Sequence, residues 1–382
     1  MKLKKAFGLI WAIFLMITCS FTQTVETVVP FNIRIADGIY VDDDGIIYTG
    51  AGGLVNQTTI GRVTPDGQVT AVASGMRGSI DIEKADNGLF YVTNYDDNTV
   101  KTYDSSTETV TTVVTGLDGP AGITKDTAGN FYVTNWGAWP NYSGHEVHKI
   151  SPDHTVEVLV SSDEFYRLQG IAMDDNGWLY ISNSQNGRVF KVDPETGAFE
   201  TFASIGTNII NMVFHEGHFY ICAGQTNRIL IMDLEGNFST YSGTGVQGGQ
   251  DGPVDQATYY RPIGIDFTAS GDTIYVSEGQ PHRLRRIILN DNTVNVFAAP
   301  QIQPLKLYPN PNSGLFRVEI PKDIGGDGTL TILDSGGKEV FTTTTNKNTE
   351  DLQLENLQEG IYFVHFVTKH GMRGGKLVIS GE

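Results

Sequence analysis

The chain has 382 residues, with 44 acidic against 26 basic side chains and a formal net charge of -18. This charge argues against nucleic acid as a partner, because phosphates would be repelled, and it disfavours docking on anionic lipid. Glycine is frequent (44 residues), aromatic residues make up 10% and charged residues only 18%, which is typical of a turn-rich all-β protein and not of a disordered chain. The length predicts two or three domains.

The N-terminus has the pattern of an export signal. Lys2, Lys4 and Lys5 precede an apolar run, Ala6–Ile17, which is too short to span a bilayer comfortably. We therefore predict a signal peptide over residues 1–23 that is removed from the mature protein. An alternative is lipidation of Cys19, because residues 15–19 loosely resemble a bacterial lipobox.

The middle of the chain repeats. An apolar residue followed by tyrosine recurs six times, each time after a turn that ends in glycine, and the tyrosines lie 40 to 55 residues apart. They are Tyr48, Tyr91, Tyr132, Tyr180, Tyr220 and Tyr275. Strand-like runs flank each tyrosine and give four short strands per unit, which is typical of a propeller blade. We predict an all-β fold with a six-bladed β-propeller over residues 24–300.

One strand is left over in this count. Val25–Val29 reads as a fourth strand although no complete unit precedes it. A propeller ring needs its first and last blades joined, and an outer strand donated by the N-terminus would join them. We expect Val25–Val29 to pair with the last blade, beside or instead of Thr293–Ala298.

The character of the chain changes after about residue 300. A turn-rich opening, Tyr308–Pro311, is followed by alternating runs that predict a small C-terminal β-sandwich over residues 301–382. These runs are Leu315–Ile320, Gly328–Leu333, Glu339–Thr343, Ile361–Thr368 and Gly375–Ile379.

The same residues resemble a known export signal. Tyr308-Pro309-Asn310-Pro311, Gly314-Leu315-Phe316, Gly336-Gly337-Lys338, Gly360-Ile361-Tyr362 and Gly375-Lys376-Leu377-Val378-Ile379 are similar to the type A C-terminal sorting domain of the type IX secretion system. The resemblance implies a bacterial protein that the type IX machinery exports, after which it is secreted or attached to the outer-membrane cell surface. Removal of the sorting domain after export stays open. An ordinary sandwich appended for binding is the alternative.

The repeats also resemble a family. Gly243-Thr244-Gly245, Pro262-Ile263-Gly264-Ile265, Tyr275-Val276-Ser277 and Arg283-Leu284-Arg285 are similar to NHL repeats, within the SMP-30/gluconolactonase-like superfamily of propellers. In lactonases of that superfamily, calcium or zinc is held by acidic and amide side chains where inner strands begin. The comparable positions are Asp37, Gly78, Ala121, Gln169, Ile210 and Ile263. Only Asp37 supplies a carboxylate, so no cofactor is expected beyond a divalent cation held at Asp37.

Polar residues recur three places after the blade tyrosines, and we predict that they line one rim of the channel. They are Asn94, Asn135, Asn183 and Glu278. Gln169 and Asn211, near the starts of inner strands, could join them. The alternative is that the asparagines only cap turns.

Two long loops point to the same face. The loop after Asn135 carries Trp136, Trp139 and Tyr142, which could form a platform for sugar rings or plug the channel, and Ser242–Tyr260 is rich in glycine. We therefore predict non-covalent binding of a glycan or protein ligand on this loop-rich face. The enzymatic alternative is a metal-dependent lactonase or lyase at the channel mouth.

Overall fold

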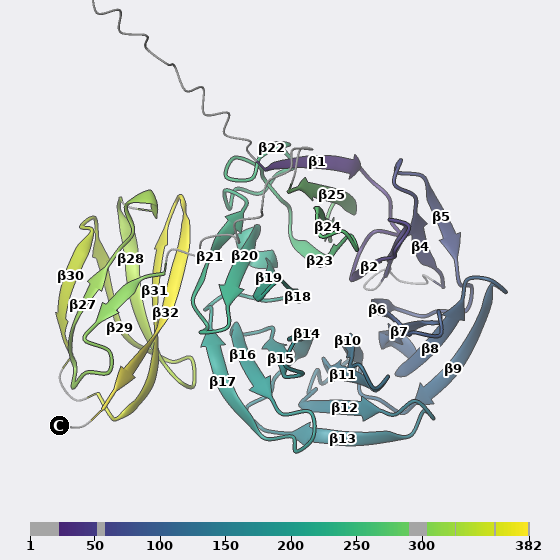
Figure 1. The fold of residues 1–382 in the computed structure, drawn as a ribbon, viewed down its shortest axis with the longest axis horizontal. Helices are drawn as coiled ribbons and strands as arrows, with labels where there is room; N and C mark the ends of the chain where they lie inside the picture. Colours follow the sequence, from purple (N-terminus) through teal and green to yellow (C-terminus); the bar gives the residue numbers. More distant parts are fainter. Residues whose placement is uncertain (1–22, 52–57, 290–303, 325, 355–356, 381–382) are drawn as a thin grey trace, which may run out of the picture.

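The computed structural model describes residues 23–51, 58–289, 304–324, 326–354 and 357–380, and it is built almost entirely from β-strands. Six sheets are arranged around a central axis, and beside them lies a two-layered sandwich, one layer of which continues one of these sheets (Figure 1). The predicted signal peptide, Cys19 and Thr293–Ala298 lie outside the described residues. None of the helices among these residues is long and apolar enough to cross a membrane.

Each sheet is one blade whose strands run from the axis outward. Blade one contains β2 (Ile39–Val41), β3 (Ile47–Thr49), β4 (Ile60–Val63) and β5 (Val69–Val72). Blade two contains β6 (Ser79–Lys84), β7 (Phe90–Asn94), β8 (Thr99–Asp104) and β9 (Thr109–Thr115). Blade three contains β10 (Pro120–Lys125), β11 (Phe131–Asn135), β12 (Glu146–Ile150) and β13 (Val156–Ser161).

Blades four to six follow the same order. Blade four contains β14 (Leu168–Met173), β15 (Leu179–Asn183), β16 (Arg188–Val192) and β17 (Phe199–Ser204). Blade five contains β18 (Asn211–His215), β19 (His218–Ala223), β20 (Arg228–Asp233) and β21 (Phe238–Ser242). Blade six contains β23 (Pro262–Phe267), β24 (Thr273–Glu278) and β25 (Arg283–Ile288).

The repeated apolar–tyrosine pair is where one blade packs on the next. Tyr91 of blade two stacks on Phe131 of blade three with ring centroids 4.0 Å apart, and Tyr180 of blade four contacts Phe219 of blade five at 4.3 Å. Both faces of each second strand are therefore covered by neighbouring blades. This explains why all five residues of β7, β11 and β15 are buried instead of alternating.

The last blade is completed by the N-terminus. Strand β1 (Thr24–Val29) pairs antiparallel with β25, with Val25 opposite Ile287, and so takes the outer position of blade six. The short β22 (Gly252–Pro253) pairs with the other side of β1. The predicted junction is confirmed.

The C-terminal domain is a sandwich of two sheets over one core. One sheet contains β26 (Lys306–Tyr308), β27 (Leu315–Glu319) and β30 (Thr349–Gln353). The other contains β29 (Glu339–Thr345), β28 (Gly328–Asp334), β31 (Gly360–Thr368) and β32 (Gly371–Ile379). Apolar side chains of both sheets, including Phe316, Leu330 and Phe366, are buried between them.

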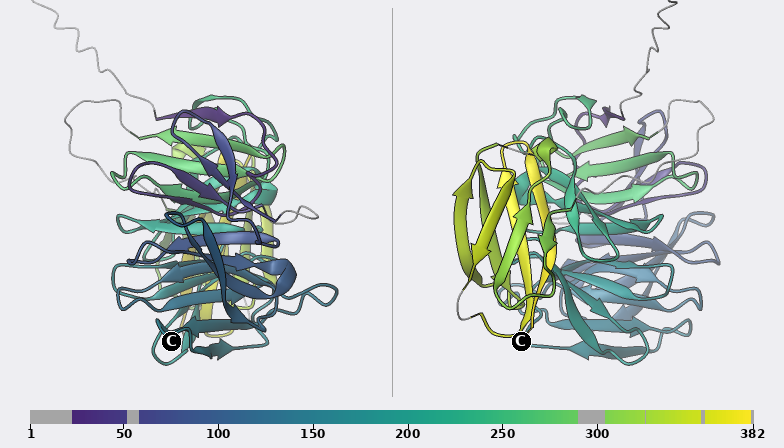
Figure 2. Two further views of the ribbon diagram at one scale, coloured as in Figure 1. Left: turned by 90° about the vertical axis from the view of Figure 1, so that its right-hand side faces the viewer. Right: turned by 60° about the vertical axis from the view of Figure 1, so that its left-hand side comes forward.

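The sandwich is joined to blade five edge to edge. Strand β32 pairs antiparallel with β21, with Phe238 opposite Gly374, so that blade five and the larger sandwich sheet form one continuous sheet of eight strands (Figures 1 and 2). Met372 packs into the same core cluster as Phe238. The otherwise open edge of blade five is covered in this way.

We predict that Gly374→Ala separates the two domains. A Cβ at Gly374 would lie 2.1 Å from the Phe238 ring, whereas a Cβ at Gly375 would lie 3.4 Å from Asn237. Small-angle X-ray scattering of the full chain should show a larger radius of gyration for Gly374→Ala and an unchanged one for the control Gly375→Ala. Equal radii for both variants would contradict the pairing of β21 with β32.

The docked interface should also weaken in acid. His365 of β31 is buried against Phe238, and its Nε2 atom donates a hydrogen bond to the Ser204 carbonyl. Burial lowers the pKa of His365 from 6.5 to about 4, an effect larger than the opposing one of the Ser204 hydrogen bond. Docking is therefore stabilised above pH 6.5, and this stability is lost as the pH falls toward 4, because the undocked state takes up the proton first.

The scattering measurement repeated from pH 7.5 to pH 4.5 tests this expectation. His365→Gln keeps a donor but does not titrate, so its radius should depend less on pH than that of the wild type. His370→Gln changes an exposed histidine of the same domain and should follow the wild type. A wild-type profile that matches His365→Gln would contradict the role of His365.

Candidate functional site

The inner strands approach one another so closely that glycine is required where they meet. A Cβ at Gly38, Gly122, Gly170 or Gly264 would lie within 3 Å of backbone atoms in the next blade. The pairing registers place these glycines at equivalent positions, directly before Ile39, Ile123, Ile171 and Ile265. The channel is therefore narrowest at this ring of residues.

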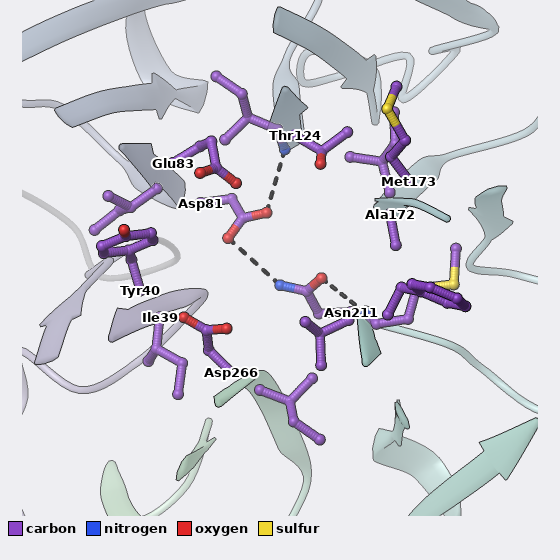
Figure 3. Close-up of a pocket in the computed structure, with 16 residues that line it drawn as sticks. Ile39, Tyr40, Asp81, Glu83, Thr124, Ala172, Met173, Asn211 and Asp266 are labelled. Carbon is purple, nitrogen blue, oxygen red and sulfur yellow. Dashed lines mark hydrogen bonds between the residues drawn. The ribbon is translucent and has the colours of Figure 1, made fainter. Parts of the chain in front are cut away.

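Two blades carry a larger residue at the ring. Asp81 of blade two and Asn211 of blade five occupy the equivalent positions, and these two blades are opposite one another in a ring of six. The Asn211 Nδ2 atom donates to the Asp81 Oδ1 atom at 3.4 Å (Figure 3). The space around this contact is only about 10 Å³. The Asp81–Asn211 pair therefore closes the channel and separates a cavity on each face.

The first cavity opens toward the turns between first and second strands, which we call the hairpin face. It has a volume of about 270 Å³. Asp81, Glu83, Asp266 and Tyr40 line one side of it, while Ala172 and Met173 lie on the other (Figure 3).

Backbone groups fix the acidic side chains in this cavity. Asp266 accepts the amide of Val41 at 2.7 Å, and Asp81 accepts the amide of Ile123 at 3.2 Å. Burial raises the pKa of Asp81 to about 7, of Asp266 to about 7 and of Glu83 to about 8.

These raised pKa values predict a propeller that is more stable in mild acid. Each carboxyl binds its proton more tightly in the folded state, so the stability is fully present below about pH 4 and is lost as the pH rises through 7 to 8. Glu83→Gln imitates the protonated acid and should reduce the fall in melting temperature between pH 5 and pH 8.5. Asp44→Asn, at an exposed turn, is the control. A wild-type melting temperature that rises over this range, with no difference for Glu83→Gln, would contradict the assignment.

The second cavity lies at the opposite mouth, on the face formed by the second-to-third-strand loops and the blade connections, which we call the loop face. Its volume is about 450 Å³. Its lining combines two arginines, neutral amides and two aromatic rings. The polar and aromatic members are Asp37, Tyr95, Trp136, Arg167, Gln169, Ser184, Gln185, Asn208, Gln225 and Arg261.

Trp136 forms one wall of the loop-face cavity, as the sequence suggested. Its Nε1 atom donates to the Ser184 Oγ atom at 3.2 Å, and its ring contacts Tyr95 and Tyr142 edge-on. Tyr142 therefore supports Trp136 from behind. Trp139 is 74% exposed and does not line the cavity.

The asparagines predicted to form a polar rim are instead buried turn caps. The Asn94 Oδ1 atom accepts the amide of Arg77 at 2.8 Å, and the Asn183 Oδ1 atom accepts the amide of Tyr166 at 3.0 Å. Both asparagines are fully buried and their Nδ2 atoms are bonded to backbone carbonyls. They hold the connection that leads into their own blade and present no group to a ligand.

Glu278 is placed in the same way, whereas Asn135 is buried without capping a turn, since its Oδ1 atom has no hydrogen-bond partner among the described residues. Glu278 accepts the amide of Tyr260 at 3.0 Å and is ion-paired with Arg283 and Arg285. Asn135 is buried and its Nδ2 atom contacts the His148 Nδ1 atom at 2.8 Å. Of the predicted rim, only Gln169 lines the loop-face cavity, and Asn211 lies below it in the channel.

The glycine-rich loop connects blades five and six and so belongs to the loop face, but it does not reach the cavity. No residue of Ser242–Tyr260 lines the loop-face cavity. Asp251 instead accepts hydrogen bonds from the Thr27 backbone amide and hydroxyl, and the Val254 amide donates to the Gln23 carbonyl. The loop thus holds the N-terminal strand β1 on blade six.

The residues at the channel mouth do not fit a divalent cation. The register places Ile80, not Gly78, at the position equivalent to Asp37, since Ser79 pairs with Asn94 as Pro120 pairs with Asn135 in blade three. Asp37 is therefore accompanied by Ile80, Ala121, Gln169, Ile210 and Ile263, of which only Gln169 has an oxygen donor in its side chain. Among the described residues, no group of three His, Cys, Asp or Glu side chains could hold a metal ion. Burial raises the pKa of Asp37 well above its usual value.

Sequence reasoning missed both arginines of the loop-face cavity, although a signal for them exists. A tyrosine–arginine pair precedes the inner strand in blades four and six, as Tyr166-Arg167 and Tyr260-Arg261. Asp81 and Glu83 were missed because blade two was aligned two residues out of register, so that Asp81 did not stand out against the glycines.

The C-terminal domain has a known family. Residues 306–380 match the secretion system C-terminal sorting domain. This domain marks bacterial proteins that type IX secretion exports to the cell surface or the extracellular space, as the sequence motifs implied. No curated protein matches the chain.

Solved structures share the fold of the propeller. A gluconolactonase from Xanthomonas campestris is 14% identical over 70% of this chain and 90% of its own, with a TM-score of 0.56. An auxiliary nutrient binding protein from Bacteroides ovatus is 16% identical over 70% of this chain and 76% of its own, with a TM-score of 0.58. A virginiamycin B lyase from Staphylococcus aureus is 14% identical over 70% of this chain and 99% of its own, with a TM-score of 0.50.

At this identity the likeness concerns the fold alone. The chain is therefore a substrate of type IX secretion in which a six-bladed propeller, with the fold also seen in gluconolactonase, is followed by a secretion system C-terminal sorting domain.

Proposed function

We propose that the propeller is an exported binding module that holds a saccharide in the loop-face cavity. The observation that carries this proposal is the lining of the cavity, where amide and guanidinium groups surround an aromatic wall. Such convergent polar groups around an aromatic surface are typical of ligand sites on rigid scaffolds.

The channel geometry supports binding at this face. Because the Asp81–Asn211 pair closes the channel, a ligand that enters the loop-face mouth cannot pass through to the hairpin face. The donor set around Asp37 supports binding over lactone hydrolysis, since the metal that polarises a lactone carbonyl needs several oxygen ligands. The Bacteroides ovatus propeller that shares the fold is described as a nutrient binding protein, which agrees with this proposal.

A glycan array tests the proposal on the full exported chain. We expect the wild type to bind at least one class of saccharide and Trp136→Ala to bind it about tenfold more weakly or worse, because the aromatic wall is lost. Trp139→Ala is the matched control and should bind normally, since that side chain lies outside the cavity.

Melting temperatures separate loss of the wall from loss of the fold, and Gln169→Ala provides a second change inside the cavity. Binding of no saccharide, or binding that depends on Trp139 and not on Trp136, would contradict the proposal. A saturable rise in melting temperature with calcium or zinc, abolished by Asp37→Ala, would favour the enzymatic alternative instead.

A further inference from the structure

The Arg167 guanidinium is held rigidly but not neutralised. Its carbon atom lies 5.2 Å from the centroid of Trp136, 5.1 Å from Tyr142 and 5.2 Å from Tyr166. Its Nε atom is buried without a hydrogen-bond partner. In the part of the chain that the structure describes, no carboxylate forms an ion pair with it, whereas Arg188, at the start of β16 in the same blade, is paired with Glu164 at 2.6 Å.

Arg261 resembles Arg167 in this respect. It lines the same cavity and is exposed, and within the described ranges its guanidinium has neither a hydrogen bond nor an ion pair. Asp37 is the acidic residue that also lines this cavity, and burial raises its pKa well above the usual value. The charge of Arg261 opposes this shift, but the two side chains form no ion pair within the described ranges.

Both arginines stand at a backbone position that other blades give to glycine. The carbonyl of Arg167 accepts the Ser184 amide and that of Arg261 accepts the Gly279 amide. Gly78 and Gly119 make the same hydrogen bond in blades two and three, where their carbonyls accept the amides of the residues after Asn94 and Asn135.

All four residues have φ between 55° and 60°, the left-handed region that favours glycine. Arginine is strained there, and yet blades four and six place an arginine at this position beside the cavity. Residues in such conformations concentrate at ligand sites.

The chemistry of these groups specifies the ligand. Two unpaired guanidinium groups bind a carboxylate or sulfate well, through forked, charge-assisted hydrogen bonds. The neutral amides of Gln169, Gln185, Asn208 and Gln225 suit hydroxyl groups. A long polyanion is disfavoured, because the chain carries a net charge of -18.

We propose, on the basis of the binding function above, that the loop-face cavity takes a short acidic saccharide whose carboxylate or sulfate group is bound by Arg167 and Arg261. Trp136 and the amides then contact the sugar rings. An acidic peptide offers the same charge without the hydroxyl groups, and we treat it as an outcome of the test.

Isothermal titration of the full exported chain with four matched probes tests this inference. The probes are trigalacturonate, its neutral methyl ester, a sulfated chondroitin disaccharide and a tri-glutamate peptide. We expect trigalacturonate or the sulfated disaccharide to bind, and the methyl ester to bind about tenfold to a hundredfold more weakly than trigalacturonate if the acid is a carboxylate. The tri-glutamate peptide should not bind.

Arg261→Gly gives the sharpest variant, because blades two and three show that glycine fits this backbone position. It should melt at or above the wild-type temperature and yet bind the acidic probe at least tenfold more weakly. Arg167→Lys should lose affinity to an intermediate degree, since it keeps the charge but loses the planar fork. Arg77→Gln, an exposed arginine of the blade one to blade two connection, should bind like the wild type.

The outcomes separate the two proposals. If the neutral ester binds as well as the acid, and Trp136→Ala abolishes that binding, the saccharide site stands and the anion inference is overturned. Preference for tri-glutamate overturns the saccharide class. Unchanged affinity in Arg261→Gly overturns the role of that arginine, and absence of binding by all four probes counts against the inference as a whole.

Discussion

The close approach of the six inner strands is the constraint on which both cavities depend. Where glycine lines the ring, the backbones nearly touch, and any side chain would collide with the next blade. Asp81 and Asn211 are accommodated because they point inward and meet across the axis. A propeller built in this way cannot conduct a ligand from face to face. It has two separate mouths, of which the hairpin-face mouth is acidic and the loop-face mouth contains unpaired arginines.

The buried caps give these arginines their orientation. Asn183 and Glu278 hold the amides of Tyr166 and Tyr260, and each of these residues directly precedes an arginine in a left-handed conformation. A buried hydrogen bond thus compensates for the strained backbone of the arginine that follows. It also positions the guanidinium of that arginine at the rim of the cavity. The polar residues that recur after the blade tyrosines therefore contribute to the site by positioning it and not by contacting a ligand.

Much of the fold was predictable because it rests on local repetition. The apolar–tyrosine pairs fix the second strands, the count of outer strands predicted that Val25–Val29 pairs with the last blade, and the C-terminal motifs identified the sorting domain. The site was less predictable because blade two has serine and aspartate where blade three has proline and glycine, which hides the equivalence of Asp81 with the ring glycines. The edge-to-edge pairing of β21 with β32 leaves no trace in either domain's own pattern, since Phe238 and its partner Gly374 are 136 residues apart in the sequence.

Hydrogen–deuterium exchange of the full exported chain, with and without trigalacturonate, tests the central claim most directly, because it reports where a ligand sits without any substitution. The account predicts slower exchange in the connections that contain Arg167 and Arg261 and in the loop after Asn135, with no change around Glu83 and Asp266 on the hairpin face. Protection confined to the hairpin face, or protection nowhere in the propeller, would contradict it.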